Sequence, residues 1–300
     1  MPISPSSSAA GGKVAGIGPG RVLAGLVGRG ILESRTPWMH ECEADAQGLR
    51  MVYALLDFTD RGWSDELLPE VIAAARRIGF AGLNVTFPFK QAVIPLLDEL
   101  APGAAAIGAV NTIAFIHGRT IGHNTDVTGF AEAFASGLPD APVARVLQLG
   151  CGGAGSATAH ALLGQLGAQR LILADTDMAR AEALARQLAD AYGAARVELT
   201  DAPASAAASA DGLVNATPIG MAKFPGLPIA AEAIRADHWV ADIIYFPLET
   251  ALLKTARALG CRTLNGRGMA VGQAADAFEV FTGRLPDRAR MAASFARFTA

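Results

Sequence analysis

The sequence has few cysteines and few charged residues for its length. Its three cysteines, Cys42, Cys151 and Cys261, lie far apart in a chain of 300 residues, which argues against a disulfide framework or a paired C-x-x-C metal site. Charged residues make up 18% of the chain and its formal net charge is −3, without a run of Lys and Arg. We therefore expect no nucleic-acid partner. The five histidines never fall four residues apart, and we predict no metal site.

Long apolar runs are also missing. The uncharged stretch 100–118 is interrupted by Pro102, Gly103 and Gly108, so we expect no bilayer span and no membrane partner. Residues 1–12 have neither the basic region nor the apolar core of a secretory signal, and we expect a flexible tail over 1–20. These features predict a cytoplasmic protein. A hydrophobic content of 51% over 300 residues favours two packed domains.

From Arg21 onward, short apolar runs alternate with longer amphipathic segments, which is typical of a parallel sheet covered by helices. The fold class is therefore α/β with two domains, an α/β substrate domain at 21–128 and a doubly wound Rossmann-type dinucleotide-binding domain at 129–267. We expect strands at 22–27, 51–57, 82–87, 145–149, 170–174, 197–199, 212–215 and 239–242. We expect helices at 66–79, 91–100, 153–167, 178–192 and 269–282, the last of which ends at Gly283.

A glycine-rich turn, GCGGAG at 150–155, joins an expected strand to an expected helix. Gly150, Gly152 and Gly155 have the G-x-G-x-x-G spacing that allows a tight turn, a close approach of the pyrophosphate and close helix packing. The phosphates are expected at the helix N-terminus. Asp175 follows 20 residues after Gly155, at the end of the next strand, where its carboxylate can accept hydrogen bonds from the adenosine ribose. A tight turn without a ligand is the alternative.

Charge near this turn predicts NAD rather than NADP. A 2′-phosphate would lie beside Asp175 and Asp177, and such like-charge juxtaposition costs several kcal/mol. Arg180 is the nearby cation. In the alternative interpretation, Asp175 caps a turn and Arg180 reaches a phosphate.

Lys90 is one of four lysines, beside 21 arginines, and lies at the start of an expected helix. The helix dipole disfavours a cation there, so a lysine at this position is a candidate acid or base. A solvated lysine at a helix end is the alternative. Asp126 could pair with Lys90 or could be a helix N-cap, and the spacing leaves both open. His123 is a competing candidate for proton transfer, and Cys151 is expected to be a small filler beside the cofactor.

Several polar side chains at expected strand ends, among them Asn84, Thr86, Asn111 and Thr125, suit a polyhydroxylated substrate, although each singly is more often a turn residue.

Together these segments resemble the shikimate dehydrogenase family, from about Leu23 to Gly283. The motifs that carry the resemblance occur in the family's order: NVTFPFK at 84–90, GAVNT at 108–112, NTD at 124–126, the loop at 150–155, NATPIG at 215–220, DIIY at 242–245 with Pro247, and GRGM at 266–269 through Gln273.

The resemblance implies a two-domain fold with the active site between the domains, in which helices at 268–300 complete the substrate domain. It also implies that Lys90 and Asp126 are the catalytic pair and that Lys90 transfers the proton. The implied substrate-binding residues are Ser34, Thr36, Asn84, Thr86, Asn111, Thr125, Tyr245 and Gln273. The resemblance adds Thr217, Ile243 and Gly266 as cofactor contacts. The full set of expected cofactor-binding residues is then Gly150, Gly152, Gly153, Ala154, Gly155, Asp175, Arg180, Thr217, Ile243 and Gly266.

Two positions depart from most of the family. This chain has Ser34-Arg-Thr36 where Ser-x-Ser is usual, and Asp175-Thr-Asp177 where many members have an Asn-Arg-Thr cluster that binds a 2′-phosphate. Both departures resemble the NAD-dependent quinate/shikimate dehydrogenase branch. We therefore expect reversible, NAD-dependent oxidation of the C3 hydroxyl of quinate and shikimate, with a polyhydroxy cyclic carboxylic acid as substrate and a possible homodimer. The alternatives are an NADP-dependent biosynthetic shikimate dehydrogenase and, from another class, a non-catalytic dinucleotide-sensing module.

Overall fold

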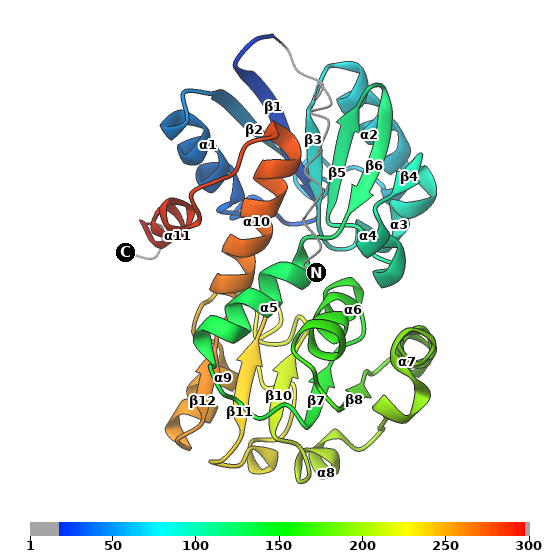
Figure 1. Cartoon of the computed structure of the whole chain (residues 1–300), viewed down its shortest axis with the longest axis vertical. Coiled ribbons are helices and arrows are strands. Elements are labelled where there is room, and N and C mark those ends of the chain that lie inside the picture. Colours follow the sequence, from blue (N-terminus) through cyan, green and yellow to red (C-terminus); the bar gives the residue numbers. More distant parts are fainter. Residues whose placement is uncertain (1–17, 298–300) are drawn as a thin grey trace, which may run out of the picture.

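Two six-stranded sheets, one above the other in Figure 1, organise the chain. The structure is a computed structural model and describes residues 18–297. The tail expected at 1–20 therefore lies almost entirely outside the described residues. Within 18–297, no helix is both long enough and apolar enough to cross a membrane. The two-domain α/β fold expected from the sequence is confirmed.

The first sheet belongs to the substrate domain and has the strand order β2-β1-β3-β5-β6-β4. Strand β1 is parallel to β2 and β3, whereas β5 is antiparallel to both β3 and β6. The strands are β1 (Arg21–Gly28), β2 (Arg50–Asp57), β3 (Gly82–Val85), β4 (Glu99–Leu100), β5 (Thr112–Ile116) and β6 (Arg119–His123). The helices around this sheet are α1 (Thr36–Ala46), α2 (Leu68–Arg77), α3 (Phe89–Ala92), α4 (Pro102–Ile107), α10 (Arg267–Thr282) and α11 (Arg288–Ala296).

Alternating side chains of this sheet enter two cores. Ala24 and Leu26 of β1 belong to a core that includes Phe278 and Phe281 of α10. Val27 of the same strand belongs to a second core that includes residues of α2. Because the sheet is buried on both faces, its strands are largely apolar, as the sequence pattern predicts. The α10 helix ends at Gly283, whose φ of 67° is left-handed, as predicted for a C-cap glycine.

The second sheet is all parallel, with the order β12-β11-β10-β7-β8-β9. This is the order of a doubly wound dinucleotide-binding fold, and the strand order reverses between β7 and β10. The strands are β7 (Arg145–Leu149), β8 (Arg170–Ala174), β9 (Val197–Leu199), β10 (Gly212–Asn215), β11 (Trp239–Asp242) and β12 (Arg262–Leu264). The helices are α5 (Asp126–Gly137), α6 (Gly153–His160), α7 (Met178–Tyr192), α8 (Pro203–Ala207) and α9 (Ala251–Ala258).

Most predicted elements of this second domain have the predicted bounds, including β7, β8, α7, β10 and β11. The prediction of one helix over 91–100 is wrong. In the structure α3 ends at Ala92, a 3₁₀ turn covers Ile94–Leu96, and Glu99–Leu100 is strand β4. Pro95 lacks an N–H and its ring clashes with the preceding helical turn, which is why the apolar spacing does not produce a helix.

Helices α5 and α10 lie side by side between the two sheets (Figure 1). They touch through glycine backbones. A Cβ on Gly129 would lie 2.8 Å from the backbone N of Gln273, and one on Gly272 would lie 2.8 Å from Cα of Gly129. Without side chains at these two positions, the first turn of α5 comes close to Gln273 on α10.

Candidate active site

Lys90 and Asp126 form an ion pair at the edge of the first sheet. Lys90 Nζ lies 2.6 Å from Asp126 Oδ2, and the two side chains are 17% and 5% exposed. Lys90 is in α3, directly after β3, and Asp126 is the first residue of α5, directly after β6. Asp126 does not cap its helix with a side-chain hydrogen bond, because the N-cap is Thr125. Of the two interpretations left open by the sequence, the structure favours the pair.

Backbone hydrogen bonds hold both members of the pair on the segment GAVNT at 108–112. The backbone N–H of Val110 donates to the carbonyl of Lys90 at 2.8 Å. The Asn124 side chain donates to the Ala109 carbonyl and accepts from the Asp126 N–H. The pair is therefore fixed by three segments that are far apart in the sequence.

Four of the polar residues implied as substrate contacts form a continuous network beside this pair. Asn84 Nδ2 donates to Thr112 Oγ1 at 2.9 Å, and Thr112 Oγ1 donates to Asn111 Oδ1 at 3.1 Å. Asn111 Nδ2 donates to Thr125 Oγ1 at 2.9 Å, and Thr125 Oγ1 donates to the Gln273 carbonyl at 3.0 Å. The structure thus brings together Asn84 of β3, Asn111 just before β5, Thr125 just before α5 and Gln273 of α10.

Ser34 and Thr36 lie together at the start of α1, with a 3.0 Å hydrogen bond between their hydroxyls. Thr86 follows β3, where its methyl group occupies the space beside Gly28 on β1. Tyr245 follows β11 and packs edge-on against Phe295 of α11, with 6.4 Å between ring centroids. Burial and the charge of Asp126 raise the pKa of Tyr245. Its phenol therefore remains a hydrogen-bond donor near the ion pair at neutral pH.

The glycine-rich turn has the shape that a pyrophosphate site requires. Gly150 has φ 98°, and a Cβ there would lie 2.7 Å from the Ala216 backbone after β10. A Cβ on Gly155 would lie 2.2 Å from the Gly150 carbonyl, so the helix packs directly on the turn. A Cβ on Gly152 would meet nothing within 4 Å. Gly152 thus faces open space at the N-terminus of α6, where a dinucleotide phosphate fits.

Asp175 is fixed against this turn by backbone N–H groups. Its Oδ2 accepts from the Cys151 N–H at 2.7 Å and its Oδ1 from the Asp177 N–H at 2.9 Å. Arg180 contacts Asp177 Oδ2 at 3.1 Å and Asp175 Oδ1 at 3.5 Å. Arg180, the cation that the sequence places near the glycine-rich turn, therefore contacts both carboxylates.

Thr217, Ile243 and Gly266 lie close together after β10, β11 and β12. The Ile243 N–H donates to the Asn215 carbonyl at 3.1 Å, and a Cβ on Gly266 would lie 2.2 Å from the Ile243 carbonyl. Thr217 Oγ1 donates to Asn215 Oδ1 at 2.7 Å. These three implied cofactor contacts share the carboxyl edge of the sheet with the glycine-rich turn.

The glycine-rich turn also meets the ion pair. A Cβ on Gly153 would lie 3.1 Å from the Cβ of Lys90 and 3.7 Å from that of Ala109. Ser156 of α6 donates to the Ile107 carbonyl at 2.7 Å. The expected dinucleotide site and the expected proton-transfer residue are therefore neighbours where the two domains touch.

His123, the competing candidate for proton transfer, and Cys151, the expected filler, are both uncharged at neutral pH. Burial lowers the pKa of His123, whose Nε2 is buried without a partner among residues 18–297. Burial, with a contribution from Asp175, raises the pKa of Cys151 to about 12. Cys151 therefore stays a thiol at neutral pH, in agreement with its expected role as a filler. Within 18–297, no three Cys, His, Asp or Glu side chains form a cluster that could hold a metal ion.

Two supporting residues were missed at the sequence level. Gln148 is fully buried on β7, and its Nε2 donates to the carbonyls of Gly150 and Gly155 at 3.0 and 2.8 Å. It thereby holds the glycine-rich turn against α6. Its signal was present, because it is the polar residue within the apolar strand 145–149. Tyr53 on β2, which donates to Asn84, gave no such signal.

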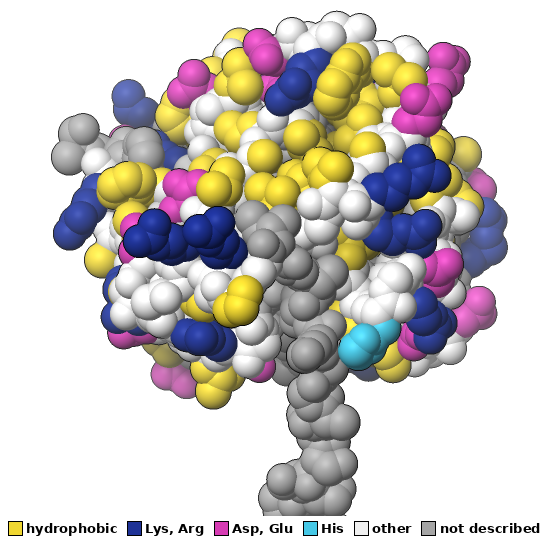
Figure 2. All heavy atoms as spheres, turned by 90° about the horizontal axis from the view of Figure 1, so that it is seen from above, with side chains coloured by type: hydrophobic (Ala, Val, Ile, Leu, Met, Phe, Trp, Pro, Cys, Tyr) yellow, Lys and Arg dark blue, Asp and Glu magenta, His cyan; other side chains and the backbone are white. Residues whose placement is uncertain are grey.

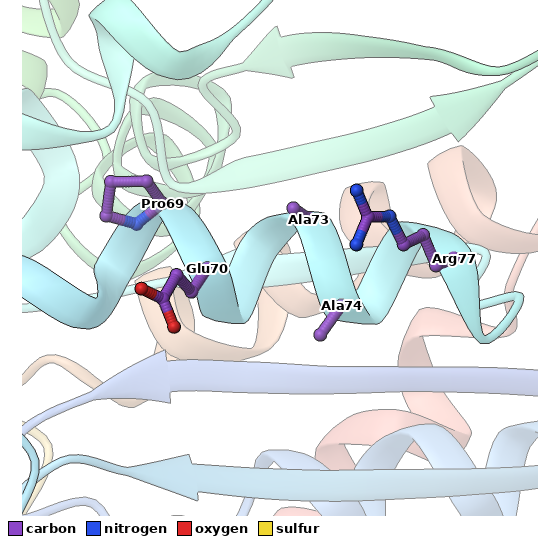
Figure 3. A pocket seen from close by; sticks show the side chains of 5 residues that line it. All are labelled: Pro69, Glu70, Ala73, Ala74 and Arg77. Carbon is purple, nitrogen blue, oxygen red and sulfur yellow. The ribbon is translucent and has the colours of Figure 1, made fainter.

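The surface elsewhere offers little enclosure. A hollow along α2 is lined by Pro69, Glu70, Ala73, Ala74 and Arg77, which lie along one helix (Figure 3). It is an open surface feature, and neither member of the ion pair lines it. Figure 2 shows the face seen from the substrate-domain end, where Lys and Arg side chains stand in separate groups with acidic and apolar side chains between them.

The fold and the site define a two-domain oxidoreductase with a nicotinamide dinucleotide site, and comparison with known proteins gives its family. A model of the shikimate dehydrogenase substrate binding domain matches residues 26–113, and one of the shikimate 5′-dehydrogenase C-terminal domain matches 266–295. The chain belongs to the shikimate dehydrogenase family, as the resemblance predicts.

The similar proteins carry both cofactor names. A shikimate dehydrogenase (NADP⁺) of Streptomyces avermitilis is 54% identical over 276 residues, 91% of this chain and 94% of that protein. A quinate/shikimate dehydrogenase (NAD⁺) of Corynebacterium efficiens is 52% identical over 278 residues, 91% of this chain and 97% of that protein. The structure of quinate dehydrogenase from Corynebacterium glutamicum in complex with NAD superposes with TM-score 0.85 at 47% identity, over 92% of this chain and 99% of that one.

Proposed function

We propose that the protein catalyses the NAD-dependent, reversible oxidation of the C3 hydroxyl of quinate and shikimate to 3-dehydroquinate and 3-dehydroshikimate. The observation that carries the choice of cofactor is Asp175, a carboxylate only 7% exposed and held by two backbone N–H groups beside the glycine-rich turn. The Corynebacterium efficiens relative, named for both acids and for NAD, supports the same choice.

In this proposal, Lys90 transfers the proton. During oxidation its Nζ takes the proton of the substrate hydroxyl, and during reduction it returns it. Asp126, 2.6 Å away and nearly buried, stabilises the resulting ammonium and holds Nζ in place. The hydroxyls and amides of Ser34, Thr36, Asn111, Thr125 and Tyr245, with Thr86 and Gln273, would bind the carboxylate and the ring hydroxyls.

The second domain would hold the cofactor. When bound, the nicotinamide supplies the acceptor or donor of the hydride. Gly152, Gly153 and Ala154 would face the pyrophosphate at the N-terminus of α6, and Asp175 would accept hydrogen bonds from the ribose hydroxyls. Thr217, Ile243 and Gly266 would lie along the nicotinamide half, because they lie beyond the strand-order reversal from Asp175. We propose domain bounds of 21–128 with 268–300 and 129–267, and the homodimer and the cytoplasmic location stay predictions.

A second candidate is an NADP-dependent shikimate dehydrogenase, which the Streptomyces avermitilis relative favours. Initial rates of NADH or NADPH formation at 340 nm, with quinate or shikimate and NAD or NADP, distinguish the two. We expect turnover of both acids with NAD. Turnover limited to shikimate with NADP would replace our proposal by the second candidate.

The role of Lys90 is tested by Lys90→Ala, which we expect to retain NAD binding and to lose roughly 10²–10⁴-fold in kcat. Lys254→Ala, on the exposed side of α9, is the control and should keep wild-type kinetics. A Lys90→Ala enzyme with kcat within a few-fold of wild type would move the proton-transfer role to His123. Intact protein that binds NAD and turns over neither acid would instead indicate a dinucleotide-sensing module, against which the ion pair of Lys90 and Asp126 argues.

A further inference from the structure

Tyr53 is a buried tyrosine next to the candidate site that proton transfer through Lys90 does not use. It lies on β2, is 5% exposed, and donates its phenol hydrogen to Asn84 Oδ1 at 2.6 Å. Burial, with a smaller contribution from Tyr245, raises the pKa of Tyr53 well above its ordinary value. The phenol is therefore a permanent donor toward Asn84 at the pH where the enzyme works.

Asn84 cannot offer its amide hydrogens to a ligand without breaking existing bonds. Its Nδ2 donates to Thr112 Oγ1 at 2.9 Å and to the Asn111 carbonyl at 3.3 Å. Because the Asn111 carbonyl can only accept, Nδ2 must face it, and Oδ1 is left to accept from Tyr53, so the carboxamide takes one orientation. Asn84 thus links Tyr53 to Thr112 through the hydrogen bonds of its carboxamide.

From Asn84 the hydrogen bonds run in one direction. Thr112 accepts from Asn84, and so its own hydrogen points to Asn111 Oδ1 at 3.1 Å. Asn111 Oδ1 also accepts from the Thr125 N–H at 2.9 Å, which fixes the Asn111 amide with Nδ2 toward Thr125 Oγ1. One Nδ2 hydrogen of Asn111 is donated to Thr125 Oγ1, and the other is the one that this inference assigns to a ligand.

We propose that Tyr53 is a positioning residue for the substrate: its phenol holds the Asn84 carboxamide, supports the hydrogen bonds that run from Asn84 to Thr125, and thereby keeps the Asn111 amide donor turned toward a polyhydroxy acid. This inference rests on the proposed function of the site. It assigns Asn84 an indirect role, through Asn111, in place of a direct substrate contact.

The Tyr53 phenol acts as an uncharged hydrogen-bond donor. The ring of His40 on α1 stacks on that of Tyr53, with centroids 4.8 Å apart and an interplanar angle of 29°. His40 is fully buried, and burial lowers its pKa to about 3, so its imidazole is neutral. Lys90 and Asp126, beside the network, neutralise each other at 2.6 Å, and the Glu41 carboxylate accepts from the backbone N–H of Tyr53 and not from its phenol. The phenol therefore acts through its hydrogen bond and not through a change of charge.

Removal of the phenol group leaves Asn84 Oδ1 without its donor. The carboxamide still faces the Asn111 carbonyl but is held less firmly, and the hydrogen bonds from Asn84 through Thr112 to Asn111 loosen with it. The fraction of enzyme with the amide donor turned toward the substrate falls, and the apparent affinity falls with it. The ion pair of Lys90 with Asp126 does not belong to this chain of bonds, so kcat should be spared.

The test is Tyr53→Phe, which keeps the ring stacked on His40, with Tyr192→Phe as the matched control. Tyr192 also loses one hydrogen bond, to His160 Nδ1 at 2.9 Å, but in the dinucleotide-binding domain. We expect Tyr53→Phe to raise KM for the acid roughly five- to thirtyfold, with kcat and KM for NAD within about twofold. Tyr192→Phe should leave KM for the acid unchanged, and both variants should lose a similar few degrees in Tm.

A double-mutant cycle shows whether Tyr53 acts through Asn84. In an Asn84→Ala background, Tyr53→Phe should change KM for the acid by no more than about twofold further. Additive effects, an unchanged KM in Tyr53→Phe, or a fall in kcat that accompanies the rise in KM would each overturn the inference while leaving the proposed function intact. Wild-type enzyme that turns over neither quinate nor shikimate would refute the proposed function, and the inference with it.

Discussion

The preference for NAD is expected to depend on the charge of Asp175. Its carboxylate is 7% exposed and cannot turn away, because Cys151 and Asp177 donate backbone N–H groups to its two oxygens. A phosphate monoester carries about −1.5 charges near neutral pH. If this phosphate lay about 5 Å from the Asp175 carboxylate, with an effective dielectric constant of about 40, the repulsion would be about 2.5 kcal/mol. This corresponds to roughly 70-fold discrimination against NADP.

We therefore expect Asp175→Ser to lower the ratio of kcat/KM for NAD to that for NADP by roughly 70-fold. The variant gives up the carboxylate that accepts from the Cys151 N–H, and Arg180 loses one of its two carboxylate partners. The assay is the initial rate at 340 nm with saturating shikimate and varied NAD or NADP. Most of the change should come from a lower KM for NADP.

Asp177→Asn is the matched control for this variant. Its carboxylate is 47% exposed and accepts from the Arg180 N–H at 3.1 Å as the cap of α7, so solvent screens its charge. We expect a change in the cofactor ratio below about tenfold. Arg180→Ala in the Asp175→Ser background should abolish most of the gain with NADP. An Asp175→Ser enzyme that keeps the wild-type ratio with intact NAD kinetics would refute the argument from charge.

Three further changes have expected outcomes. His40→Phe should remove an acid-sensitive component of stability, because the pKa of His40 is about 3 in the folded protein against 6.5 in the unfolded chain. The stability that neutral His40 contributes is present above pH 6.5 and is lost as the pH falls, on the order of 3 kcal/mol by pH 4. Urea unfolding at pH 7 and at pH 4 measures this, and the free energy of unfolding should fall by about 3 kcal/mol less in the variant than in the wild type. Gly129→Ala places a Cβ 2.8 Å from the Gln273 N and should cost about 1–3 kcal/mol and raise KM for the acid, as checked by thermal unfolding and kinetics. Thr36→Ser removes a methyl beside the hydroxyl that Ser34 contacts at 3.0 Å, and should shift the quinate-to-shikimate ratio of kcat/KM toward shikimate while kcat with shikimate stays within about twofold.

The fold was predictable where hydrophobicity and local signals agreed. Strand β8 and helix α7 have the predicted bounds because an apolar run ends at Asp175 and the helix begins after Asp177, which caps it. The helix prediction for 91–100 is wrong because apolar residues recur there with helical spacing, although Pro95 interrupts the helix. The order of the strands is not contained in such local patterns, since it depends on which apolar faces pack together.

The pairing of Lys90 with Asp126 shows what the strand order adds. The two residues are 36 positions apart, and the sequence left Asp126 as either a cap or a partner. In the first sheet β5 is antiparallel to both β3 and β6, with Asn84 opposite Thr112 and Thr112 opposite His123. Strands β3 and β6 therefore run in the same direction and end at the same edge. The residues that follow them, Lys90 and Asp126, come together for that reason.

Gln148 and Tyr53, which the sequence did not reveal, hold other residues of the site in place by hydrogen bonds. Gln148 could have been found, because a buried amide in an apolar strand needs partners, and the nearest unpaired carbonyls are those of the glycine-rich turn that follows it. Tyr53 could not, because an aromatic residue in a strand is ordinary and Asn84 lies two strands away in the sheet. Motifs identify the groups that touch substrate and cofactor, whereas the orientation of those groups is set by hydrogen bonds between distant segments. If Tyr53 acts as proposed, the affinity of this site for its acid depends on a residue outside every motif that identified the family.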